Sequence, residues 1–151
     1  MAVTVQEAIK RLESFAAYLP SVALTTLGDT VESIKTTMQE PGEAVSYPIN
    51  WDSERQRKAY FSSDGFGHGI PYVRTGEHEA AWESKQITDG YELSNPDPAA
   101  AISGYPSGIQ WQSNIHRGRW KHIAIAVAAE TIKLPGQLIE KITIAWNRMT
   151  K

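Results

Sequence analysis

His78 and Glu79 are the residues with the most obvious potential for chemistry, because they open a His-Glu-x-x sequence. In zinc proteases a second histidine, four residues after the first, completes the grip on the metal. Trp82 occupies that position here. The histidines at positions 68, 78, 116 and 122 have no spacing that requires a shared metal. A hydrolase acting through these histidines is therefore the weakest interpretation of the sequence.

The other motifs of enzyme chemistry are also incomplete. Glycines 65, 67 and 69 are followed by Pro71, where the helix of a phosphate-binding loop should begin. There is no Walker motif, and residues 104–108 do not form a G-x-S-x-G nucleophile elbow. Glu79 and Glu83 are four residues apart, a spacing more typical of a solvated helix face than of an acid–base pair. We therefore expect no enzymatic activity and no cofactor.

Residues 110–122 form the cluster that stands out most. Trp111 and Trp120 flank the cationic side chains of Arg117 and Arg119, and His116 also lies between the two tryptophans. Tryptophan and arginine suit base stacking and phosphate contact in a nucleic-acid site. The same residue types dominate protein–protein interfaces. A third possibility is that the tryptophans anchor a core while their polar neighbours face solvent.

Length, composition and charge limit the class of protein. A chain of 151 residues with 41% hydrophobic residues and 21% charged residues corresponds to one globular domain. The absence of cysteine excludes disulfides and thiolate metal sites and fits assembly in a reducing cytoplasm. No apolar run approaches the length of about 18 residues that spans a membrane, and Glu7 interrupts any signal-peptide core.

The net charge of −2 hides an uneven distribution. Residues 117–151 hold seven Lys and Arg against two Glu, a net charge of +5, so the preceding residues carry −7. Ends of opposite sign allow copies of a chain to bind head to tail, or allow a basic face to meet an acidic partner. Ordinary unevenness of composition is the alternative explanation.

The first forty residues predict a long amphipathic helix. Thr4 and Glu7 have the spacing of a capping box. Apolar residues then recur at steps of three and four from Val5 to Leu19 and again from Leu24 to Met38. Pro20 lacks an N–H and clashes with the preceding turn, so we expect the helix to break or kink there.

The remaining chain divides into three regions. Residues 41–76 are rich in loops, with a short helix that Asp52 or Ser53 could cap. Residues 77–110 are β-rich, because Asp89-Gly90 between two extended runs predicts a hairpin. Residues 111–151 are basic and mostly helical, with Pro135-Gly136 separating two helices. The expected fold is a single α+β domain over residues 1–151, in which a long broken N-terminal helix and C-terminal helices pack on a small antiparallel sheet.

Several segments resemble small tail-completion and neck proteins of long-tailed bacteriophages. Residues 72–76, Tyr-Val-Arg-Thr-Gly, followed by Trp82, resemble the R-T-G-x-L-x-x-S-W element of this family, with His78 and Ala81 replacing the leucine and serine. Residues 95–100 resemble its N-x-x-P-Y-A strand, with Ala99 replacing the aromatic residue. Residues 49–61 and 116–120 are also similar to phage proteins of this type.

The resemblance implies a structural virion protein at the head–tail junction, a head–tail connector or tail-completion protein of the neck or upper tail, assembled in the host cytoplasm. Its implied partners are copies of itself in a homo-oligomeric ring, other neck and tail proteins, and DNA in the channel, with no membrane contact. The alternative is a small DNA-binding or packaging-accessory domain that uses the basic residues and tryptophans of the 110–122 cluster. The residues that we expect to make or support the contacts are Trp51, Arg74, Trp82, Trp111, His116, Arg117, Arg119 and Trp120.

Overall fold

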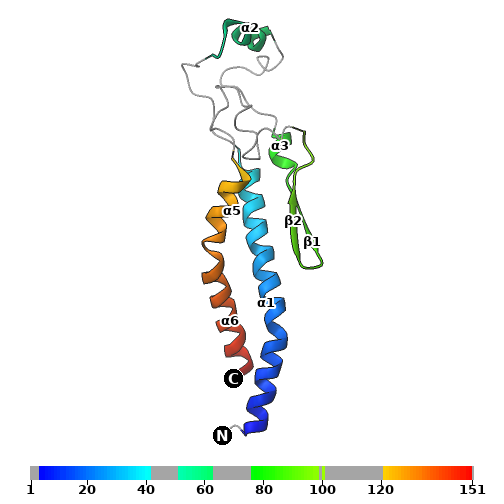
Figure 1. The fold of residues 1–151 in the computed structure, drawn as a ribbon, viewed down its shortest axis with the longest axis vertical. Helices are drawn as coiled ribbons and strands as arrows, with labels where there is room; N and C mark the ends of the chain where they lie inside the picture. The colour runs from blue at the N-terminus through cyan, green and yellow to red at the C-terminus, as the bar shows by residue number, and fades with distance from the viewer. Residues whose placement is uncertain (1–3, 42–50, 63–75, 99, 101–120, 151) are drawn as a thin grey trace.

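A single helix of 35 residues, α1 (Val5–Gln39), forms the axis of the molecule (Figure 1). This computed structural model describes residues 4–41, 51–62, 76–98, 100 and 121–150. The predicted capping box starts α1. The Thr4 hydroxyl accepts a hydrogen bond from the Glu7 backbone N–H at 3.2 Å, and the Glu7 carboxylate accepts one from the Thr4 N–H at 2.8 Å.

Of the break or kink predicted at Pro20, the break is wrong, because α1 continues through this residue. The proline cannot donate to the carbonyl of Ala16, four residues earlier, which costs about 3 kcal/mol in a helix interior. Both residues are exposed, so water can reach this side of the helix. Packing of α1 on either side of the proline, by the half-buried Phe15 and the buried Val22, holds the helix continuous.

Two C-terminal helices, α5 (Ile123–Thr131) and α6 (Leu134–Thr150), run antiparallel to α1 along one of its sides (Figure 1). They separate at residues 132–133. The prediction that Pro135-Gly136 would separate them is wrong, because both residues lie in the first turn of α6. Proline is tolerated there because the first N–H groups of a helix have no intrahelical partner.

The predicted hairpin is confirmed and lies on the other side of α1 (Figure 1). Strands β1 (Glu83–Ile87) and β2 (Gly90–Ser94) pair antiparallel, with Ile87 opposite Gly90. The two loop residues are therefore Thr88 and Asp89 rather than Asp89 and Gly90. None of the described non-glycine residues has positive φ, so these two loop positions do not adopt the left-handed conformation of a type I′ turn.

Two short helices complete the described structure. The α2 helix (Glu54–Ser62) begins as predicted, because the Ser53 hydroxyl accepts a hydrogen bond from the Gln56 N–H at 3.1 Å. The α3 helix (Glu77–Ala80) begins at Gly76, whose φ of 79° is in the left-handed region that glycine favours. Gly76 thus turns the chain into α3 immediately before the hairpin.

The core lies where the C-terminal half of α1 meets α5 and the start of the hairpin. Four buried residues form its centre, and Leu93 and Ile123 pack against them; the four are Ile34, Met38, Trp82 and Ala126. The predicted class, with a long N-terminal helix, C-terminal helices and a small antiparallel sheet packed together, is confirmed. Among the described helices, none combines the length and apolar character needed to cross a membrane.

Candidate assembly surface

The structure describes two of the residues expected at an interface. Trp82 is a core residue with only 2% of its surface exposed, and its backbone carbonyl accepts a hydrogen bond from Gln39 Nε2 at 3.2 Å. It can hold the hairpin in place but does not itself form an outer surface. Trp51 is half-buried just before α2. The other six lie outside the described residues; they are Arg74, Trp111, His116, Arg117, Arg119 and Trp120.

His78 and Glu79 are both buried in α3, so the prediction of a solvated helix face at Glu79 and Glu83 is wrong. The helix ends at Ala80, and Glu83 is instead the first residue of β1. The His78 carbonyl accepts a hydrogen bond from Asn95 Nδ2 at 2.9 Å, which ties α3 to the end of the hairpin. Within the described ranges, no group of three His, Asp or Glu residues could hold a metal ion.

The α5 helix exposes apolar side chains and buries its one charged residue, the opposite of a typical surface helix. Its sequence, Ile-Ala-Ile-Ala-Val-Ala-Ala-Glu-Thr, contains one charged residue, Glu130, and this residue is buried. Ile125 and Val127 are 68% and 40% exposed, and because they are two positions apart they lie on different flanks of the helix. Ile132, just beyond the helix, is 82% exposed. A helix that is apolar around its circumference is normally covered on all sides. We call its exposed apolar side chains, together with that of Ile132, the α5 surface.

Glu130 is stabilised in its charged form by a local ion pair. Lys133 Nζ lies 2.7 Å from Glu130 Oε1. This hydrogen bond is the largest influence that lowers the pKa of Glu130, with a smaller contribution from a hydrogen bond with Ser33 and opposition from desolvation. The single charge of α5 is therefore paired locally with Lys133, and no residue of the α5 surface itself is charged.

The N-terminal part of α1 carries a second apolar stripe. Val5, Ile9 and Leu12 recur at steps of four and three and are all exposed. Closer to α6, the ring of Phe15 packs edge-on against Trp146 with centroids 5.0 Å apart, and Arg11 donates a hydrogen bond to the Thr150 carbonyl at 3.2 Å. These contacts hold α1 against α6 as far as the C-terminal end of α6, while Val5, Ile9 and Leu12 remain exposed.

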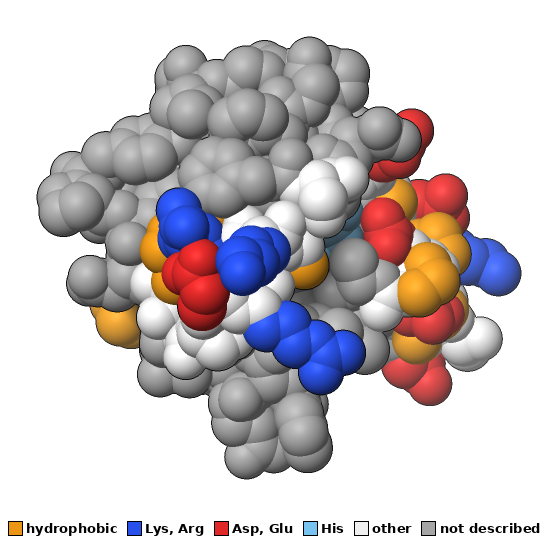
Figure 2. Space-filling view, turned by 90° about the horizontal axis from the view of Figure 1, so that it is seen from above, with side chains coloured by type: hydrophobic (Ala, Val, Ile, Leu, Met, Phe, Trp, Pro, Cys, Tyr) orange, Lys and Arg blue, Asp and Glu red, His pale blue; other side chains and the backbone are white. Residues whose placement is uncertain are grey.

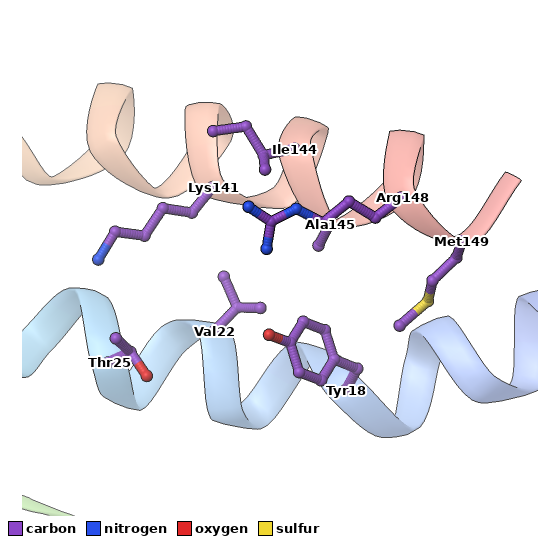
Figure 3. Close-up of a pocket in the computed structure, with 8 residues that line it drawn as sticks. All are labelled: Tyr18, Val22, Thr25, Lys141, Ile144, Ala145, Arg148 and Met149. Carbon is purple, nitrogen blue, oxygen red and sulfur yellow. The ribbon is translucent and has the colours of Figure 1, made fainter. Parts of the chain in front are cut away.

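A pocket of about 430 Å³ opens between α1 and α6 (Figure 3). Apolar side chains make up most of its wall, and Lys141 and Arg148 provide two cations. Lys141 is paired with Asp29. Arg148 is exposed and has no ion pair or hydrogen bond with any residue that the structure describes. The lining residues are Tyr18, Val22, Thr25, Lys141, Ile144, Ala145, Arg148 and Met149.

Acidic side chains gather on the hairpin side of the molecule (Figure 2). Three carboxylates of the hairpin, those of Glu83, Asp89 and Glu92, are exposed. None of them is in an ion pair within the described part of the chain. Lys85 is the only cation in the same stretch. The hairpin therefore presents surplus negative charge across α1 from the helix that carries Arg148.

No sequence motif marks these surfaces. The α5 surface had a signal in the sequence, namely nine helical residues with a single charge, but only the structure shows which side of the helix is covered. The pocket depends on the pairing of two helices far apart in the chain. No family model, curated protein or solved structure matches this chain.

Proposed function

We propose that this protein is a structural, non-enzymatic subunit that forms a ring with copies of itself in the neck or upper tail of a long-tailed bacteriophage, as a head–tail connector or tail-completion protein. The observation that carries the self-assembly part of the proposal is the α5 surface. Ile125 and Val127 on this helix and Ile132 just after it lie in water, although the only charged residue of the helix, Glu130, is buried. A protein interface would remove these side chains from water.

The arrangement of the elements also suits a ring. A ring requires a heterologous interface, in which one face of a subunit meets a different face of the next. The hairpin and α6 lie on opposite sides of α1 (Figure 1). The hairpin is acidic, and the α6 side carries the unpaired Arg148. One subunit therefore has two unlike faces with complementary charge.

The place in the phage particle rests on the resemblance in the segment from Arg74 to Trp82. Two described members of that motif have clear architectural roles. Gly76 provides the left-handed turn that starts α3, and Trp82 fills the core beneath the hairpin. These roles support a motif that shapes a structural subunit rather than one that binds a substrate.

The test of self-assembly is the substitution Ile125→Lys in the full chain. A charge at this exposed position of the α5 surface should weaken association about tenfold or more, since burying an unpaired charge costs several kcal/mol. The matched control is Thr36→Lys, which adds the same charge at an exposed position of α1. Analytical ultracentrifugation measures the association of each variant, and thermal unfolding shows whether each remains folded.

The test of the place in the particle is a phage lacking this protein. The proposal predicts filled heads and tails that fail to join, with joining restored by the wild-type protein. Electron microscopy of lysates counts joined and unjoined particles. Normal joining in its absence, together with a strictly monomeric purified protein, would refute the proposed function.

A further inference from the structure

We propose that the hairpin tip of one copy, Ile87–Gly90, docks into the pocket between α1 and α6 of the next copy. This inference rests on the proposed function, because it assigns the contact by which neighbouring subunits of the ring recognise each other. Ile87 would enter the apolar part of the pocket, and the Asp89 carboxylate would pair with Arg148.

The pocket has the composition of a protein anchor site. Val22 and Ala145 form a buried apolar floor, while Tyr18 and Ile144 stand exposed at its sides. Its volume of about 430 Å³ is at the small end of ligand sites, which range from about 300 to 1,000 Å³. Interfaces of this kind are commonly centred on a side chain that fills such a pocket, with Tyr and Arg contributing strongly.

The hairpin tip supplies a matching protrusion. Residues of a strand alternate between its two faces. On the face toward α1, Tyr91 packs against Gly28, and Ser84 hydrogen-bonds with Glu32. Ile87 pairs with Gly90 beside the turn, and its side chain is 48% exposed. It is the only large apolar residue of the two strands that is exposed to this degree within the described chain.

Charge complementarity selects a second copy of this chain as the occupant. Asp89 is exposed in the turn, and no described residue forms an ion pair with it. The only cation of the pocket without an ion pair among described residues is Arg148, whose side chain lies along the α6 wall with its guanidinium toward the middle of the pocket (Figure 3). Lys141 already forms an ion pair with Asp29. The Asp89 carboxylate of the tip and the Arg148 guanidinium of the pocket therefore carry opposite charges that a contact between two copies would pair.

Docking would also cover exposed apolar surface on both copies. Tyr18, Ile87 and Ile144 are between 42% and 48% exposed in the single chain. Because the tip and the pocket are different surfaces of the subunit, the contact is heterologous and leaves each copy with one tip and one pocket available to its two neighbours. Repetition of this contact closes a ring if the rotation between neighbours allows it.

The experiment is a charge exchange in the full chain. Arg148→Glu and Asp89→Arg are each expected to raise the dissociation constant of self-association about tenfold or more. The combined variant restores the pair with its charges reversed, so its association should return toward the wild-type value. Arg55→Glu, which reverses an exposed cation on α2, is the matched control and should have no effect. Ile87→Ser tests the apolar part separately and should also weaken association.

Analytical ultracentrifugation at several protein concentrations separates the outcomes. If the wild-type protein assembles and the single and combined variants assemble equally well, this contact is overturned while the proposed ring stays intact. Single variants that dissociate without recovery in the combined variant would overturn the pairing of Asp89 with Arg148. A wild-type protein that remains monomeric at all concentrations would overturn the proposed function and this inference together.

Discussion

Substitution of Gly28 tests how the hairpin is seated on α1. Gly28 is buried within α1, opposite Tyr91 of β2. A Cβ atom added at this position would lie 2.6 Å from the Tyr91 hydroxyl oxygen and 2.8 Å from the ring carbon that carries it. Both distances are below those of real Cβ contacts, so Gly28→Ala must displace either the tyrosine ring or the whole hairpin.

Two opposing effects set the size of the change. Alanine is more favourable than glycine in a helix interior by about 1 kcal/mol. Overpacking a tight contact typically costs about 1 to 3 kcal/mol. The ring of Tyr91 is only half-buried and has some freedom to move, so we place the net loss in the free energy of unfolding at about 1 kcal/mol. For a chain of this length, that loss lowers Tm by about 2 to 4 °C.

A double-mutant cycle should reverse the sign of the effect of Gly28→Ala on the free energy of unfolding. In the Tyr91→Ala background the obstruction is removed, so Gly28→Ala should stabilise the protein by up to about 1 kcal/mol through helix propensity alone. Urea denaturation monitored by circular dichroism measures all four variants. If Gly28→Ala stabilises the wild-type and Tyr91→Ala backgrounds equally, β2 does not pack on Gly28 and the described position of the hairpin is incorrect.

Three further predictions concern the core and the start of α1. Trp82→Ala should lower the free energy of unfolding by about 3 to 5 kcal/mol, because the side chain is 2% exposed in the core; an unchanged Tm accompanied by weaker association would instead indicate an interface residue. Thr4→Ala should cost about 0.5 to 2 kcal/mol and increase hydrogen exchange in the first turn, and no change in either would refute the cap. The hydrogen bond from the Thr4 backbone is the main cause that lowers the pKa of Glu7 below its ordinary value of 4.5. The charged Glu7 carboxylate therefore stabilises the folded protein above pH 4.5, and this stabilisation is lost as the pH falls through the lowered pKa. The difference in urea stability between wild type and Glu7→Gln should therefore be larger at pH 7 than at pH 3, and a difference independent of pH would contradict this.

Local signals in the sequence were sufficient for most of the elements. The capping box at Thr4 and Glu7 and the cap at Ser53 each depend on residues within a few positions of one another. Such features can be predicted because their hydrogen bonds and backbone angles do not require the rest of the fold. The hairpin follows the same principle, since two strands of alternating residues are joined by a two-residue turn.

The incorrect predictions involve residues whose behaviour is set by tertiary contacts. Pro20 should break an isolated helix, but packing on both sides of it keeps α1 continuous. Pro135 was expected between two helices and instead lies in a first turn, where its missing N–H is harmless. Glu79 is buried because α3 ends one residue after it and the chain turns into β1.

The candidate site could be predicted only in part. The uneven charge of the two ends of the chain indicated that the subunit could have unlike faces. In the structure, Asp89 in the hairpin and Arg148 in α6 lie on opposite sides of α1, and neither forms an ion pair with a described residue. The pocket could not be predicted, because it joins residues of α1 to residues of α6 that are more than one hundred positions away. Most of the expected contact residues lie in the 101–120 segment or at Arg74, outside the described residues.

The most direct test of the proposed function is the mass of the purified full chain in solution, measured by sedimentation equilibrium from low to high concentration. We predict a discrete closed oligomer that forms as the concentration rises, and we predict that Ile125→Lys reduces it while Thr36→Lys does not. A protein that remains at the monomer mass of 16.7 kDa throughout would contradict the proposal that this chain is a ring-forming subunit.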